Sequence, residues 1–356
     1  MDLELLYDQG STMFENVRKG PPKFSKKTSE KIESLINEID RLVDSGAFLE
    51  SDFFGKKIGL PFGISAGAAY GSKFLGMYEK LGYGFLTQKT VRMIRWEGNP
   101  MPHVMSVGNG DYHSGFLKSE NLTTALSNSF GMCCLGPDFW EDDLRKFVKR
   151  SKVPLVLSGV VTKPQDREDV IHQYAELAKK AKDIGAVAYE ANVSCPNEME
   201  GHSGELQDDN DLCFDIVRES KKAGINVFIK IGFRENMEMF VEKVGRVVDG
   251  IVAINTKSAQ IKDEKGRFAY TNREKAGVSG EPLKTYAENA LLNILKLRSK
   301  MGYRFRVLSV GGVTKPEDVR NRLNAGADFV ESSAMAMLYP PLALEVKKLL
   351  LESSLK

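Results

Sequence analysis

Residues 186–197 read AVAYEANVSCPN, an apolar run that leads directly into a polar turn. The apolar start predicts a short buried β-strand. Beyond it, Asn192 and Asn197 bracket Cys195, and each asparagine offers both a hydrogen-bond donor and an acceptor. Together they could hold a flat, amide-rich ring against a thiol that accepts a proton. The alternative is a strand end with asparagine turn chemistry and an unrelated cysteine.

Along the rest of the chain, short apolar runs alternate with segments that have a helical period. Amphipathic segments that predict helices include Arg167–Lys182, Asp211–Lys222, Met237–Val248 and Leu283–Lys300. Eight strands separated by helices predict an α/β protein with a (β/α)8 TIM barrel, and an open doubly wound sheet is the alternative. The predicted strands are Phe62–Ala66, Phe85–Gln88, Leu155–Ser158, Ala188–Asn192, Val227–Ile231, Ile251–Asn255, Val307–Val310 and Phe329–Glu331.

Two further segments complete the predicted domain organisation. Residues 1–57 form an N-terminal extension, in which Ser29–Val43 has a helical period of apolar residues. We expect this helix to pack on the outside of the barrel domain, residues 58–356, although a partner-binding arm is the alternative. The stretch Thr90–Pro137 between the second and third strands is too long for an ordinary connection. It is therefore predicted to be an insertion that covers the C-terminal face of the barrel.

Composition narrows the class of protein. The chain has 356 residues, of which 50 are basic and 48 acidic, so its net charge of +2 gives no electrostatic reason to expect nucleic acid or a membrane surface as partner. No apolar run approaches the roughly 20 residues of a membrane-spanning helix. The four cysteines include no Cys-x-x-Cys pair, so we expect neither a metal site nor an iron–sulfur cluster. These features favour a reduced, cytoplasmic protein.

Three glycine- or serine-rich stretches follow or flank the last predicted strands. They contain Gly280, the pair Gly311 and Gly312, and the pair Ser332 and Ser333. In many barrels the loops after the last two strands bind a phosphate through backbone N–H groups and a helix N-terminus. The stretches therefore predict a phosphate site, with ordinary tight turns as the alternative.

Asn192–Asn197 resembles the Asn-x-Ser-Cys-Pro-Asn loop of class 1 dihydroorotate dehydrogenases, whose class 2 relatives have serine in place of the cysteine. The resemblance extends from about Gly59 to about Pro341 through several motifs in the same order. It implies an FMN enzyme that oxidises dihydroorotate to orotate in pyrimidine biosynthesis. Cys195 would be the general base that removes the C5 proton while hydride leaves C6 for flavin N5. Lys89, which class 2 enzymes lack, would lie between flavin and substrate.

The resemblance also implies which residues bind FMN. Ala66 and Gly67 match positions at the flavin edge, and Lys230 matches the lysine near flavin N1 and O2. The alternative for Lys230, which lies in an otherwise apolar strand, is a side chain that reaches to the barrel mouth. Gly280, Gly311, Gly312, Ser332 and Ser333 would hold the FMN phosphate, with Ser332 replacing the usual glycine.

A ring of asparagines would bind the substrate. The matching residues are Asn128, Phe130, Gly131, Met132, Asn192, Asn197, Asn255 and Thr256. Any one of these asparagines could be a turn former instead. Phe130 replaces the usual methionine and Cys133-Cys134 replaces the usual Pro-Asn, and these departures could alter the preferred pyrimidine.

Several alternatives stay open on sequence alone. The chain could be an FMN reductase of another pyrimidine or of an enone, or a non-redox barrel that binds a sugar phosphate. The electron acceptor could be a small soluble molecule such as fumarate, or NAD by way of a partner subunit with FAD and an iron–sulfur cluster. We expect a homodimer, which is the state of the fumarate-using enzymes within class 1.

Overall fold

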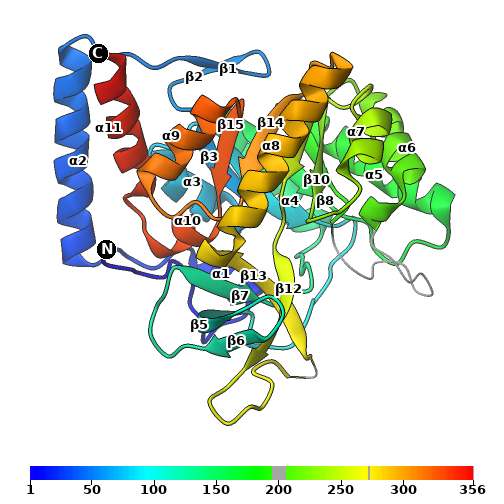
Figure 1. The fold of residues 1–356 in the computed structure, drawn as a ribbon, viewed down its shortest axis with the longest axis horizontal. Coiled ribbons are helices and arrows are strands. Elements are labelled where there is room, and N and C mark those ends of the chain that lie inside the picture. Colours follow the sequence, from blue (N-terminus) through cyan, green and yellow to red (C-terminus); the bar gives the residue numbers. More distant parts are fainter. Residues whose placement is uncertain (195–205, 272, 356) are drawn as a thin grey trace.

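The computed structural model describes residues 1–194, 206–271 and 273–355. Its centre is a closed barrel of eight parallel strands in which each strand pairs with the next one in the barrel (Figure 1). The strands are β3 (Phe62–Ala69), β4 (Leu86–Val91), β8 (Leu155–Gly159), β9 (Ala188–Asn192), β10 (Asn226–Ile231), β11 (Gly250–Ala253), β14 (Arg306–Val310) and β15 (Phe329–Ser332). All eight predicted strands are present, and the predicted TIM barrel is confirmed.

Helices surround this barrel, and several of them contact its strands directly. In α5 (Arg167–Ile184), the Asp166 side chain caps the first turn, and Gly185 ends the helix in a left-handed conformation. Tyr174 and Leu177 lie on its fully buried face. The other outer helices are α3 (Ser72–Lys80), α4 (Pro137–Arg150), α6 (Asn210–Lys221), α7 (Met237–Val244), α8 (Lys284–Met301), α9 (Pro316–Ala325), α10 (Ala334–Leu338) and α11 (Leu342–Ser354).

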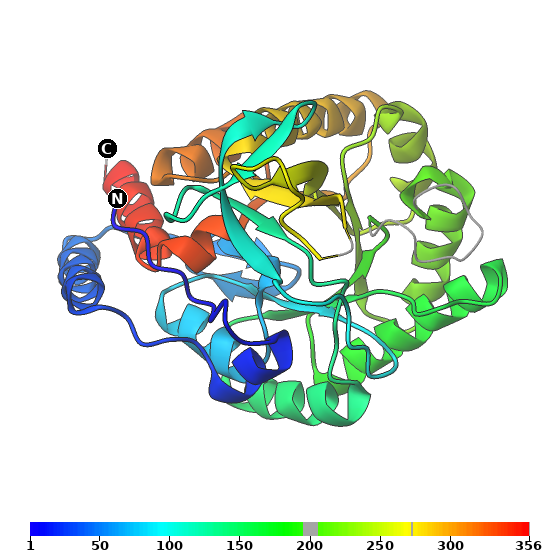
Figure 2. The same ribbon diagram turned by 90° about the horizontal axis from the view of Figure 1, so that it is seen from below.

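A second, smaller barrel covers one end of the first (Figure 2). Its strands are β5 (Val104–Asp111), β6 (Gly115–Lys118) and β7 (Ala125–Asn128) from the predicted insertion, with β12 (Lys257–Lys262) and β13 (Lys275–Gly280). The insertion therefore covers the barrel as predicted. The glycine-rich stretch 276–280, which the sequence marks as a loop before the next helix, is a strand instead. It pairs with β7, and its alternating burial is typical of a strand.

The predicted N-terminal helix is α2 (Lys26–Asp44), which begins three residues early because the Ser25 side chain caps it. It packs on the outside of the domain, as predicted: Leu35 and Ile39 contact Leu344 and Leu351 of α11. The extension also contains α1 (Met13–Lys19) and a hairpin of β1 (Ser51–Phe53) and β2 (Lys56–Ile58). Among the described residues, no helix combines the length and apolar character needed to cross a membrane.

The β1–β2 hairpin closes the end of the barrel opposite the small barrel. Its Phe53 is fully buried and stacks on Phe85, with 4.3 Å between ring centroids. Phe228 and Phe329 pack edge-on against the same ring. The bottom of the barrel is therefore a sealed apolar layer, which leaves the opposite end for polar chemistry.

We predict that Phe53→Ala lowers the free energy of unfolding by about 3–5 kcal/mol, because it leaves a cavity in this layer. The control is Phe48→Ala in the same segment, since Phe48 is 68% exposed and its loss should change stability by at most about 0.5 kcal/mol. Urea denaturation of both variants measures the difference. Similar losses in both would show that the hairpin does not seal the barrel.

Candidate active site

One cavity of about 610 Å³ opens at the carboxyl ends of the barrel strands, beneath the small barrel. Every predicted site residue that the structure describes lines it: Ala66, Gly67, Lys89, Asn128, Phe130, Gly131, Met132, Asn192, Lys230, Asn255, Thr256, Gly280, Gly311, Gly312, Ser332 and Ser333. Cys195 and Asn197 lie outside the described residues. The volume is within the range of small-molecule and cofactor sites. Residues that the sequence motifs scatter over most of the chain thus meet in a single space.

The glycine-rich end of the cavity depends on close backbone approach. Gly311 and Gly312 have φ angles of 104° and 71°, which favour glycine. A Cβ atom on Gly312 would lie only 2.2 Å from the Cα of Lys284, so no larger residue fits. Likewise, a Cβ on Gly67 would lie 2.2 Å from the hydroxyl oxygen of Ser333.

A buried carboxylate holds the loop after β14 in place. Asp318 accepts hydrogen bonds from the backbone N–H groups of Thr314 and Lys315, at 2.9 and 3.1 Å, and pairs with the Lys284 ammonium at 2.6 Å. Burial raises the pKa of Asp318, but the bonds from Lys284 and Thr314 outweigh it, so the pKa lies below its usual value. The carboxylate is therefore charged at neutral pH, and it fixes the loop that the sequence predicts to bind phosphate.

Asparagine side chains at the other end of the cavity form one hydrogen-bonded chain. The Asn255 amide donates to the Ser194 hydroxyl at 2.7 Å, and that hydroxyl donates to the Asn192 carbonyl at 2.8 Å. The Asn192 amide in turn donates to Thr90 at 3.1 Å. Because the carbonyl and the amide nitrogen of Asn192 both bond to neighbours and the Asn255 amide donates to Ser194, the orientation of these side chains is fixed before any ligand binds.

Asn128 and Thr256 approach the same cavity wall from different elements. Asn128 ends β7 opposite Gly277 of β13, and a Cβ on Gly277 would lie 2.4 Å from the Thr256 hydroxyl and 3.5 Å from the Asn128 amide. Glycine at this position lets the two polar side chains converge. Both predicted substrate contacts therefore depend on the small barrel being closed.

Lys89 projects toward a group of aromatic rings. Its ammonium lies 4.4 Å from the ring centroid of Phe130 and 5.8 Å from that of Tyr70. Phe130 also packs against Tyr7 and His103, with centroid distances of 5.6 and 5.3 Å. The bulky ring that replaces the usual methionine is thus part of an aromatic cluster, defined here as Tyr7, Tyr70, His103 and Phe130.

The N-terminal arm, residues 3–19, was not predicted to reach the site. Its backbone pairs with the end of α10, where the N–H of Leu6 donates to the carbonyl of Met337 at 2.7 Å. Further along, the Gln9 amide donates to the carbonyl of Val104 at 3.1 Å. The Tyr7 hydroxyl lies 3.3 Å from Nδ1 of His103, whose Nε2 lies 3.0 Å from the Asn99 carbonyl. The arm therefore bridges the main barrel and the small barrel beside Phe130.

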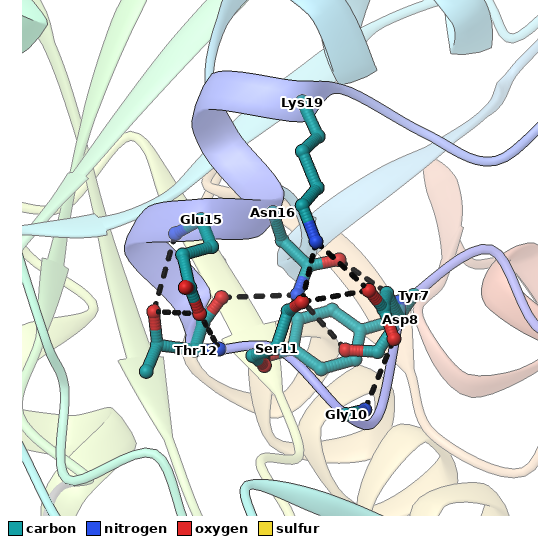
Figure 3. Close-up of polar contacts among 8 residues, drawn as sticks. All are labelled: Tyr7, Asp8, Gly10, Ser11, Thr12, Glu15, Asn16 and Lys19. Atoms are coloured by element: carbon teal, nitrogen blue, oxygen red, sulfur yellow. Dashed lines mark hydrogen bonds and ion pairs between the residues drawn. The ribbon is translucent and has the colours of Figure 1, made fainter.

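Polar contacts within the arm fix its turn (Figure 3). The Asn16 side chain donates to the carbonyls of Asp8, Ser11 and Thr12 at 3.0, 3.2 and 3.0 Å. The Asp8 carboxylate accepts from the Ser11 hydroxyl at 2.7 Å and pairs with Lys19 at 3.2 Å. The sequence here shows only local features, such as the Thr12–Glu15 capping box, and none of them indicates that the arm reaches Phe130.

Arg92 was also not identified from the sequence as a residue that supports the cavity. It is buried and donates to the Met132 carbonyl at 2.9 Å and to the Thr162 hydroxyl at 3.0 Å. Met132 has a φ angle of 51°, an unfavourable conformation for this side chain. Arg92 thus holds the loop 128–132 in the conformation that lines the cavity.

The described cysteines are poor candidates for a base. Burial is the main cause that raises the pKa of Cys133 to about 11 and that of Cys213 to about 12, and it also raises the pKa of Cys134. These thiols stay protonated at neutral pH. Within the described part of the chain, no group of His, Cys, Asp and Glu side chains could hold a metal ion.

The cavity fits FMN in size and in the kind of groups that it offers. A backbone loop at the start of α9 and the hydroxyls of Ser332 and Ser333 suit a phosphate. Small residues, Ala66 and Gly67, provide a flat wall for a ring. Lys230, only 4% exposed, supplies positive charge inside the barrel.

A family model described as "Dihydroorotate dehydrogenase" matches residues 48–352. The chain belongs to the dihydroorotate dehydrogenase family. The predicted family, enzyme class and FMN cofactor are confirmed, and so is the activity that goes with them, the oxidation of dihydroorotate in pyrimidine biosynthesis. The alternative of a non-redox barrel is set aside.

Individual relatives agree with this assignment. A dihydroorotate dehydrogenase from Dictyostelium discoideum is 26% identical over 96% of this chain and 96% of its own length. "Dihydroorotate dehydrogenase A (fumarate)" from Limosilactobacillus reuteri is 25% identical over 78% of this chain and 83% of its own. "Dihydroorotate dehydrogenase (quinone)" from Nostoc punctiforme is 23% identical over 93% of this chain and 84% of its own.

We predict that Tyr7→Ala weakens orotate binding roughly 2–10-fold, because an aromatic contact of this kind contributes about 0.5–1.5 kcal/mol and holds Phe130 against the cavity. FMN content should not change, since the Tyr7 ring contacts Phe130 and none of the predicted FMN-binding residues. Titration of the flavin absorbance with orotate gives the dissociation constant. Tyr7→Phe is the control, because it keeps the ring and removes only the hydroxyl. An unchanged constant in Tyr7→Ala would show that the arm does not support the loop.

Proposed function

We propose that the chain oxidises dihydroorotate by the class 1 route, with Cys195 as the general base. The observation that carries this proposal is that every described residue of the motif set lines one cavity, with polar side chains at one end and a glycine-rich loop at the other. Cys195 follows Ser194, whose hydroxyl lies within the asparagine chain, by one residue. A base at this point of the chain would act beside the bound ring.

Each residue has a distinct part in the proposal. Asn128, Asn192, Asn197, Asn255 and Thr256 bind the edge of the pyrimidine ring and hold it flat. Phe130, Gly131 and Met132 close the cavity over that ring. Lys89 lies between cofactor and substrate, where its charge lowers the pKa of the Cys195 thiol and allows it to remove the C5 proton. When FMN is bound, it supplies the site that accepts the hydride from C6.

The remaining residues hold the cofactor. Gly280, Gly311, Gly312, Ser332 and Ser333 bind its phosphate, and the packed backbone around Gly312 supports this contact. Ala66 and Gly67 lie against the flavin ring, and Lys230 places its charge at the N1 and O2 edge. Burial of Lys230 inside the barrel makes that charge effective, because little water screens it.

We predict that Cys195→Ala retains FMN but reduces it with dihydroorotate about 10²–10⁴-fold more slowly, since a positioned base is lost. Cys195→Ser should recover part of the rate at high pH, because a hydroxyl ionises less readily. Stopped-flow bleaching of the flavin measures both rates.

Cys213→Ala is the matched control. Cys213 is buried on α6, outside the cavity lining, so its variant should react like the wild type. A normal rate in Cys195→Ala would remove Cys195 from the mechanism. Reduction by dihydrouracil in preference to dihydroorotate would favour a different pyrimidine, as the Phe130 substitution allows.

The proposed electron acceptor is fumarate or a similar small molecule. A planar dicarboxylate shares its carboxylate and conjugated plane with orotate, so the same asparagines can bind it once orotate has left. The sequence contains no Cys-x-x-Cys pair that could relay electrons to a docked partner. The relatives do not decide the point, because their names include both fumarate and quinone. A cytoplasmic location and a homodimer remain part of this proposal.

We predict that the purified, FMN-loaded chain alone transfers electrons from dihydroorotate to fumarate but not to NAD. A panel of fumarate, NAD and a short-chain quinone tests this in one assay. Turnover with NAD by the isolated chain would overturn the proposal. Copurification with an FAD-containing protein at fixed stoichiometry would place a partner subunit ahead of fumarate, and light scattering of the same sample gives the oligomeric state.

A further inference from the structure

Three charged side chains lie inside the barrel, between its apolar bottom and the cavity. Glu190 of β9, Lys230 of β10 and Glu331 of β15 are 0%, 4% and 1% exposed. Two residues earlier on each strand are Ala188, Phe228 and Phe329, which belong to the apolar bottom layer. Because side chains alternate along a strand, the three charged groups point into the barrel one level higher.

The two carboxylates have few hydrogen-bond partners. One oxygen of Glu331 accepts from the Thr87 hydroxyl at 3.3 Å. Among the described residues, the second oxygen of Glu331 and both oxygens of Glu190 accept no hydrogen bond. Strands β14 and β3, on either side of β15, place Val310 and Gly63 in register with Glu331. The groups that face Glu331 with a charge are therefore Glu190 and Lys230.

Charge balance shows why this arrangement needs a proton. Two ionised carboxylates and one ammonium would leave a net negative charge among side chains that are at most 4% exposed, which is costly. Two neighbouring carboxylates also resist simultaneous ionisation. Burial and then the charge of Glu190 raise the pKa of Glu331 to about 8, although Lys230 and the Thr87 hydroxyl lower it. One carboxyl group thus keeps its proton at neutral pH.

We propose that Glu190 and Glu331 share one proton at neutral pH and act as positioning residues for the charge of Lys230. With this proton the cluster of three side chains is neutral, and the ammonium is not drawn down the barrel by two negative charges. Lys230 and Glu331 both line the cavity, so the charge state of the cluster acts directly on whatever binds there. Its effect on the flavin rests on the proposed function, in which Lys230 contacts the N1 and O2 edge.

Infrared spectroscopy of the FMN-loaded protein without substrate tests the shared proton. At pH 7 the wild type should show the carbonyl band of a buried protonated carboxylic acid, and Glu331→Gln should lack it. Glu190→Gln should lack it too, because Glu331 then faces only Lys230 and ionises. Glu120→Gln is the control, since the Glu120 side chain is 84% exposed.

Two infrared results would overturn the proposal. A wild type without the band has no shared proton, and the proposal fails. A band that persists in Glu190→Gln would show that burial alone keeps Glu331 protonated. It would overturn the proposal that Glu190 and Glu331 share a proton. The loss of the band in Glu190→Gln is an independent prediction, so the shared proton can still be tested if Glu331→Gln does not fold.

Thermal unfolding at several pH values gives a second readout. The pKa of Glu331 is raised from 4.5 to about 8, so its contribution to stability is fully present below pH 4.5 and is lost as the pH rises toward 8. The melting temperature of Glu331→Gln relative to the wild type should therefore rise between pH 5 and pH 9. A constant difference over this range would contradict a raised pKa.

The flavin midpoint potential tests the link to the cofactor. Above pH 8 the wild type gains a negative charge under the cavity, so its potential should fall more steeply between pH 7 and pH 9 than that of Glu331→Gln. Equal slopes would overturn the role toward Lys230 and the flavin. These measurements use no dihydroorotate, so a chain that passes them but fails to oxidise dihydroorotate would refute the proposed function and leave the cluster standing.

Discussion

The hydrogen-bonded chain from Asn255 through Ser194 and Asn192 to Thr90 is the constraint on which the rest of the site depends. It joins the carboxyl ends of barrel strands that are far apart in sequence, and Thr90 continues it to Ser158 at 3.0 Å. Loss of one partner would leave buried polar groups unpaired, at a cost of about 1–3 kcal/mol each. The site is therefore rigid before a ligand enters, and its polarity is fixed by the frame of the barrel.

The large barrel and the small barrel together enclose the cavity. The large barrel supplies the glycine-rich loop after β14, the small residues Ala66 and Gly67 and the asparagine chain, whereas the small barrel supplies Asn128 and the loop that follows it. Arg92 holds that loop from one side and Tyr7 supports it from another. An N-terminal arm that looks like a peripheral extension in the sequence thus supports the loop that lines the cavity.

The comparisons separate what is common from what varies. Relatives named for fumarate and for quinone match this chain at 25% and 23% identity over most of their length. The family and its oxidation of dihydroorotate are therefore common to these proteins, whereas the acceptor in their names differs. Inside the barrel, Glu190 and Glu331 lie near Lys230, and the proposed steps of dihydroorotate oxidation use neither carboxylate.

The sequence by itself determined the eight barrel strands and a set of residues that, where the structure describes them, line one cavity. Both are local signals: an apolar run of a few residues predicts a buried strand, and a short motif at its end marks the carboxyl edge, where parallel strands converge. Only the tertiary structure decided how β13 pairs with β7, because Gly277 and Asn128 are distant in sequence and nothing local records the pairing. Nothing local in the sequence indicates that Tyr7 lies beside Phe130, or that Glu190 faces Glu331. Each of these contacts exists because the barrel closes, and closure brings together side chains whose sequence neighbours give no sign of their partners.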